Sequence, residues 1–140
     1  MGAWGTGPFD NDDAADFATS LDHLQPDLRV GAIRDALTDA LEQTDYLDRD
    51  VGGAAVAAAA LVAAQGGNGL PIDCIHGPKQ LIPELSSDLR PIAALALVRV
   101  LGECSELNEL WIDSPDGEAW LHMVAQLTEA LSSAPVQQDC

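Results

Sequence analysis

The sequence has few basic residues, and this shortage limits the partners that it can bind. Only 6 lysines and arginines stand against 23 aspartates and glutamates, which gives a formal net charge of −17. A nucleic-acid binder needs a footprint of lysine and arginine to neutralise phosphates, and an anionic membrane surface attracts basic segments. The composition therefore argues against both kinds of partner, and a surface of one sign is expected to attract basic proteins or cations.

The sequence also shows no paired cysteine motif, no secretory signal and no long hydrophobic run. Its three cysteines lack zinc-ligand spacing, and no catalytic motif such as a serine-hydrolase turn is present. The longest apolar run, residues 51–64, is mostly alanine and is shorter than the about 20 apolar residues that a membrane-spanning helix needs. We therefore expect a cytoplasmic protein in a reducing setting, predict no cofactor and favour a function without catalysis.

The apolar residues that the sequence does contain are sufficient for one packed core. Hydrophobic residues make up 47% of the 140 residues, a length typical of a single domain. Residues 51–100 hold three acidic and three basic residues, whereas residues 1–50 and 101–140 carry net charges of −9 and −8. The neutral segment is also the most apolar, so we predict a buried centre with two acidic segments around it.

Apolar residues recur with helical spacing along most of the chain. The pattern predicts an all-α, compact single-domain bundle of five or six helices over residues 1–140, with a glycine-rich N-terminal arm packed on it. We also expect a short helix near residues 79–85, a cap at Asp88 and a frayed tail at residues 134–140. The main predicted helices span residues 10–25, 27–44, 48–65, 89–103, 105–111 and, with a proline at its first position, 115–133.

The predicted arm is residues 1–9 (MGAWGTGPF), whose glycines permit backbone conformations closed to other residues. We predict that Trp4 holds the arm in place by filling a groove between helices, because burying a tryptophan stabilises a fold by several kcal/mol. The alternative is that the arm forms a glycine-lined site for a ligand or a partner. A phosphate-binding loop does not fit, since no lysine followed by serine or threonine ends the segment.

An acidic cluster begins the first predicted helix. Asp10 or Asn11 can cap this helix, and Asp12 and Asp13 lie in its first turn, where the helix dipole favours acids. The alternative is a divalent-metal site, because helical spacing can bring Asp12 or Asp13 close to Asp16. A calcium-binding loop does not fit, since its glycine and glutamate positions are alanine and leucine here. All five residues are therefore candidate site residues, and the three within the helix are weak metal candidates.

Arg99 lies in the middle of an otherwise apolar predicted helix. A buried arginine must be paired, because an isolated charge in the core is strongly destabilising. We predict a structural ion pair between Arg99 and Asp10, Asp12 or Asp13 beneath the arm, which would join two distant segments of the chain. The alternative is that Arg99 lines a pocket and binds an anion, which makes it a candidate binding residue.

Trp111 and Trp120 stand on either side of the acidic turn at residues 113–118. We predict that at least one of these tryptophans packs in the core. The other is a candidate aromatic anchor in an acidic rim, an arrangement that suits a basic protein partner. Both tryptophans are therefore candidate binding residues.

Two parts of the chain resemble an uncharacterised bacterial family, the domain-of-unknown-function family 4259. The first is the string MGAWGTGPFDNDDA at residues 1–14, and the second comprises the segments at residues 97–103 and 105–111. The resemblance covers both ends and most of the chain. It implies a bacterial setting and a small helical domain, and it brings no established activity and therefore no catalytic residues.

The sequence favours a small protein–protein interaction module whose acidic surface binds a basic partner. One version of this function is an antagonist of a basic toxin or nuclease, as immunity proteins are. The alternative is a protein or enzyme that binds a small molecule or a divalent metal at the carboxylates of residues 10–16. A third possibility is a structural subunit of a homo-oligomer, and the sequence leaves the oligomeric state open.

Overall fold

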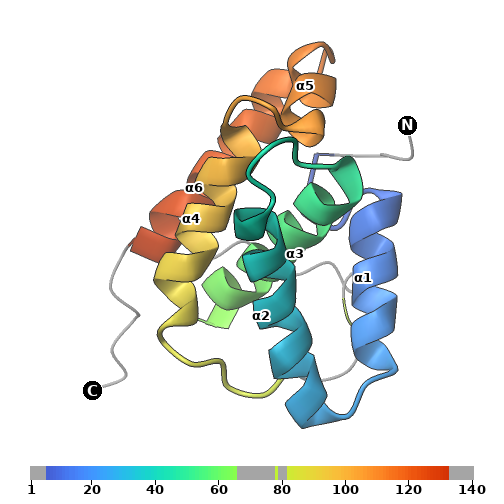
Figure 1. The fold of residues 1–140 in the computed structure, drawn as a ribbon, viewed down its shortest axis with the longest axis vertical. Helices are drawn as coiled ribbons and strands as arrows, with labels where there is room; N and C mark the ends of the chain where they lie inside the picture. The colour runs from blue at the N-terminus through green and yellow to red at the C-terminus, as the bar shows by residue number, and fades with distance from the viewer. Residues whose placement is uncertain (1–5, 66–77, 79–81, 133–140) are drawn as a thin grey trace.

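Six helices account for most of the residues that the computed structural model describes, which are residues 6–65, 78 and 82–132. The prediction of an all-α bundle of five or six helices is confirmed (Figure 1). Within the described residues no strand is formed, and Leu47 and Ser105 make an isolated parallel bridge. The helices are α1 (Asp12–Asp22), α2 (Pro26–Glu42), α3 (Arg49–Gln65), α4 (Leu89–Leu101), α5 (Glu106–Ile112) and α6 (Gly117–Ser132).

Two predictions concern the ends of the chain and lie largely outside the described residues. They are the anchoring of the arm by Trp4 and the fraying of the tail at residues 134–140. The described end of the arm includes Phe9, which is buried in the core. None of the helices in the described ranges has both the length and the apolar composition that crossing a membrane requires.

α3 forms the centre of the bundle. It packs against α1, α2, α4, α5 and α6, and Figure 1 shows it running behind α2, between α1 and α4. Most of its residues are buried, and most of the buried ones are alanine or glycine. Because such small side chains let neighbouring helices approach closely, five helices can share one central partner. The neutral, apolar segment of the sequence therefore supplies the buried centre, as its charge pattern predicts.

Side chains close the N-terminal ends of two helices. Asn11 caps α1 by accepting a hydrogen bond from the Ala14 N–H at 2.8 Å, and Ser105 accepts one from the Asn108 N–H at the start of α5. These bonds satisfy backbone donors that have no partner inside the helix. Asn11 is thus occupied by a structural task, as the capping interpretation of the acidic cluster predicts.

Three arginines cap the C-terminal ends of helices other than their own. Arg29 donates from Nε to the Leu21 carbonyl at the end of α1, and Arg90 donates from Nη2 to the Ala130 carbonyl near the end of α6. Arg99 donates from Nε and Nη2 to the Gln43 carbonyl, just past α2, at 2.9 and 2.8 Å. The last turns of α1, α2 and α6 contain no basic residue of their own. The arginines therefore supply, from neighbouring helices, the positive charge that a helix C-terminus favours.

The short helix predicted near residues 79–85 is wrong over residues 82–85, which are not helical. The Gln65 side chain holds this segment instead. Its Nε2 donates to the carbonyls of Ile82 and Pro83, and its Oε1 accepts from the Leu85 N–H at 2.7 Å. Pro83 has no N–H to give to a helix, so the side-chain amide satisfies backbone groups that a helix would otherwise have paired.

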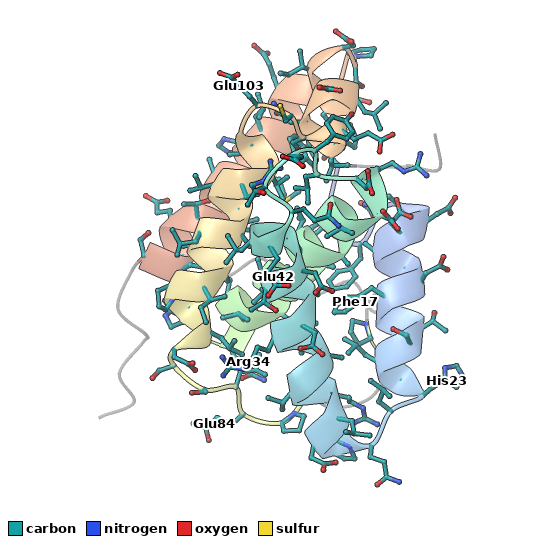
Figure 2. The ribbon with its side chains drawn as sticks, in the orientation of Figure 1. Phe17, His23, Arg34, Glu42, Glu84 and Glu103 are labelled. Atoms are coloured by element: carbon teal, nitrogen blue, oxygen red, sulfur yellow. The ribbon has the colours of Figure 1, made fainter. Side chains whose placement is uncertain are left out.

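Two predicted helix starts also differ from the structure. Asp88 makes no capping hydrogen bond to α4 and instead forms an exposed ion pair with Arg34 of α2, 3.1 Å apart. Figure 2 shows Arg34 near the start of α4. α6 begins at Gly117 rather than at Pro115, because residues 114–117 form a tight turn after α5. The turn reverses the chain so that α6 packs against α5, a constraint that local sequence signals do not contain.

Candidate functional site

A groove with acidic side chains at its edge lies between α1, α2 and α3. It has a volume of about 340 Å³. Figure 2 shows the half-buried Phe17 side chain of α1 in the space between α1 and the helices α2 and α3. We call this feature the acidic groove. Its apolar floor is Phe17, Ala32, Ala36, Val51 and Ala54, and the exposed polar residues around it are Ser20, Asp35, Asp39 and Asp50.

The three carboxylates of the acidic groove come from two helices. Asp35 and Asp39 are four residues apart on α2, so they lie on one face of that helix, and Asp50 lies in the first turn of α3. Like charges at this spacing destabilise a helix by about 0.2–0.5 kcal/mol, so the two carboxylates on α2 do not stabilise the fold through each other. Asp50 accepts a hydrogen bond from the Val51 N–H, and no such local task is found for the carboxylates on α2.

No basic side chain in the described part of the chain forms an ion pair with these three carboxylates. The two ion pairs found there are Arg34 with Asp88 and Arg49 with Asp13. The other three arginines, at positions 29, 90 and 99, donate to carbonyl oxygens at helix ends. Within the described ranges the arginines therefore hold the fold together, and the three carboxylates of the acidic groove face solvent without an ion pair, Asp35 having only a minor charge attraction to the neighbouring Arg34.

Three of the five residues of the predicted site at the start of α1 already have partners within the fold. Asp10 accepts a hydrogen bond from the Gly7 N–H at 3.1 Å, and Asp13 pairs with Arg49 at 3.0 Å. Asp12 and Asp16 are exposed on α1. Among the described residues, no group of three or more histidine, cysteine, aspartate or glutamate side chains is arranged to hold a metal ion. The contacts at the start of α1 therefore agree with the capping interpretation, to which the structure adds an ion pair between Asp13 and Arg49 of α3.

The partner predicted for Arg99 is wrong. Its guanidinium donates to the carbonyl oxygens of Gln43, Glu103 and Cys104, and the carboxylate of Asp13 pairs with Arg49 instead. The carbonyls at the end of α2 need donors, and one guanidinium presents several donors in a fixed fork. Arg99 therefore joins α4 to the end of α2 through Gln43, and its other hydrogen bonds hold the segment that follows α4.

The two tryptophans are both buried, which confirms that at least one packs in the core, whereas the exposed aromatic anchor expected of the other is wrong. Trp111 is 5% exposed and Trp120 is 3% exposed. Their rings are stacked, with centroids 5.7 Å apart and planes 7° from parallel. Stacking fixes α5 against the start of α6, and it removes both side chains from the surface that a partner can reach.

Sequence reasoning missed the acidic groove, although part of its signal was present. The spacing of Asp35 and Asp39 places both on the polar side of one helix, away from its apolar stripe. No local sequence signal connects Asp35 and Asp39 with Asp50 or Phe17. The packing of α1 and α3 on α2 brings these residues together.

Tyr46 and Glu109 form a second acidic feature, between the end of α2 and α5. The Tyr46 hydroxyl donates to Glu109 Oε1 at 2.8 Å. This hydrogen bond is the main cause that raises the pKa of Tyr46 to about 12, with smaller effects from desolvation and from the charges of Glu109, Glu106 and Asp48. The neutral phenol is favoured because it donates to the carboxylate, whereas the phenolate would face it with like charge.

Replacing Glu109 with alanine is expected to lower the pKa of Tyr46 from about 12 toward its ordinary value of 10.0. In the protein that keeps Glu109, the unfolded state loses the Tyr46 phenol proton at a lower pH than the folded state does. The free energy of unfolding therefore falls as pH rises through the window from about 10 to about 12. The chain has a single tyrosine, so a spectrophotometric titration of phenolate measures this pKa directly. Glu103→Ala, at an exposed carboxylate nearby, is the control; an equal shift in both variants would contradict the assignment.

Comparison with known proteins gives one match. A family model described as a domain of unknown function (DUF4259) matches residues 2–123, which contain all the groups described above except the end of α6. No curated protein and no solved structure matches the chain.

Proposed function

The chain belongs to the DUF4259 family, a domain of unknown function, and we propose from its surface chemistry that it is a non-catalytic module that binds basic proteins. The observation that carries the proposal is the acidic groove, in which an apolar floor lies beside three carboxylates that form no ion pair with the described basic residues. Its natural setting in this proposal is the bacterial cytoplasm. A partner of opposite charge would neutralise the carboxylates of the acidic groove.

The acidic groove fits a lysine or arginine side chain of the partner. Such side chains combine a hydrophobic stem with a charged head, and the stem can lie along the alanines while the head meets the carboxylates. The face of Phe17 offers a further attraction for a cation. A volume of about 340 Å³ suits one or two side chains rather than a large cofactor.

Charge also acts before contact is made. A net charge of −17 on a chain of this length attracts a basic protein from a distance and raises the rate of association. An antagonist that must capture a toxic basic protein quickly would benefit from such steering, and this is the form of the proposal that we favour. Because the Debye length shortens as salt is added, the association rate is expected to fall steeply with ionic strength.

The variant Asp35→Asn/Asp39→Asn/Asp50→Asn tests the groove. Its affinity for a fluorescently labelled decalysine peptide, measured by anisotropy at low salt, is expected to fall by about tenfold, since each partly exposed ion pair contributes up to about 1 kcal/mol. Fold stability should be kept, because the change removes repulsion on α2 and leaves an acceptor at position 50. A decaglutamate peptide should not bind.

A second triple variant controls for net charge. Asp113→Asn/Asp116→Asn/Glu118→Gln removes the same three charges from exposed positions at the turn before α6 and at its start. It is expected to weaken decalysine binding by less than threefold, because only long-range attraction is lost. Equal losses in the two triple variants would show that the groove has no special role, and a salt-independent association rate would remove the argument from charge.

The partner itself can be sought by native mass spectrometry of the protein purified from its own host at low salt. A second, basic polypeptide at fixed stoichiometry is the expected result, and its release by salt would follow from the proposal. Added mass from a metal or a small molecule on a lone chain would instead support the carboxylate site at residues 10–16.

A further inference from the structure

A second surface of the molecule is apolar rather than acidic. α4 and α6 lie side by side along one edge of the bundle, as Figure 1 shows, and a groove of about 770 Å³ runs between them. We call this feature the α4–α6 face. Its main lining residues are Pro91, Ala94, Leu95 and Val98 of α4 and Thr128 and Leu131 of α6.

The α4–α6 face exposes large hydrophobic side chains that no residue in the described ranges covers. Leu95 is 58% exposed and Val98 is 61% exposed, and they lie on the opposite side of α4 from its buried Leu97 and Val100. α4 is therefore apolar on both its inner and its outer side. Neighbouring exposed apolar side chains beside a groove offer a place where a partner can dock.

The charge of the lining residues shows what kind of partner fits. Among the described residues no acidic side chain lines the groove, and the one charged residue there, Arg90, donates a hydrogen bond to the Ala130 carbonyl of α6. A basic protein finds no counter-charge here, so this face does not serve the function proposed above. For a second copy of the chain, which also carries a charge of −17, a face without carboxylates allows approach with the least repulsion.

We propose that the α4–α6 face is the interface of a homodimer, in which the face of one copy packs against the same face of the other. Such an isologous contact uses one self-complementary patch and closes after two subunits. It would bury Leu95 and Val98 on both copies and would leave both acidic grooves exposed, since α1 and α3 do not line this face. The dimer would thus present two binding sites for a basic partner.

Sedimentation equilibrium of the full chain tests the dimer. The mass is expected to rise with concentration from 14.7 kDa toward twice that value as the protein approaches about 1 mM. Added salt should strengthen the dimer by screening the repulsion between acidic copies, the opposite of its effect on the binding of a basic partner. A mass of one chain at every concentration and salt level would overturn the proposal.

The variant Val98→Glu locates the interface. It places a carboxylate in the middle of the face and is expected to weaken dimerisation by at least about tenfold, because the charge would be buried without a partner. Ile112→Glu is the matched control, since Ile112 is also 61% exposed but lies on α5. Circular dichroism and a folded monomer verify that both variants keep the fold. Equal weakening by both variants, or none by Val98→Glu, would exclude the α4–α6 face as the interface.

Discussion

Replacing Gly117 with alanine is expected to lower the free energy of unfolding by about 3 kcal/mol. A Cβ at this position would overlap the carbonyl oxygen of Trp111 and would lie 3.1 Å from its carbonyl carbon. Because both are backbone atoms, no side-chain rotation relieves the clash, and α5 would have to move away from α6. That movement would also separate the stacked rings of Trp111 and Trp120. Urea denaturation followed by tryptophan fluorescence measures both effects.

Gly31→Ala is the matched control, and the opposite sign is expected. Gly31 lies in the interior of α2 and is exposed, and a Cβ built there meets no atom within 4 Å. Alanine in an exposed helix interior is more stable than glycine by roughly 0.5–1 kcal/mol, so this variant should unfold at higher urea. The same sign in the two variants would contradict the close approach of α5 and α6.

Replacing Arg99 with methionine is expected to lower the free energy of unfolding by about 2–3 kcal/mol. The substitution keeps an unbranched apolar side chain in α4 but removes the Nε and Nη2 donors to the Gln43 carbonyl. The end of α2 would then lose its cap and the charge that favours its dipole. Arg99→Lys is expected to recover part of this loss, because an ammonium group retains the charge but not the fork of donors. Urea denaturation measures all three proteins.

The control for this experiment is Arg34→Met, which removes an arginine that pairs with a carboxylate on the surface. The Arg34 and Asp88 side chains are both substantially exposed, and solvent screens such pairs strongly, so little change in stability is expected. The comparison therefore separates the effect of a helix cap from the effect of losing a positive charge. If Arg34→Met were as destabilising as Arg99→Met, the capping role of Arg99 would not stand.

The helices could be predicted from the sequence because their apolar spacing is a local property. α3 shows this well, since a run of alanine and valine ended by a pair of glycines at positions 66 and 67 defines nearly the same bounds in the structure. The start of α6 could not be predicted as well. Pro115 is a good first residue for a helix, but the chain must first turn back on α5, and that requirement comes from packing.

The partners of the arginines could not be predicted because they depend on which helix ends lie nearby. Arg99 and Gln43 are 56 residues apart in the sequence, and no local pattern in either segment predicts their contact. A sequence rich in acids makes a carboxylate the obvious partner, whereas the structure gives Arg99 the Gln43 carbonyl just past α2. The same long-range packing hides the acidic groove, since Phe17, Asp39 and Asp50 belong to three different helices.

The alanine-rich centre separates the scaffold of this bundle from its charged surface. The alanines at positions 57–60 are fully buried, and most of α3 faces other helices, so larger side chains there would force the bundle apart. The carboxylates at positions 35, 39 and 50 are exposed and take no part in the core. The three carboxylates of the proposed binding groove are thus separate from the core, whereas its apolar floor is part of it. A protein built in this way can change its specificity through surface substitutions alone, while its interior stays the same.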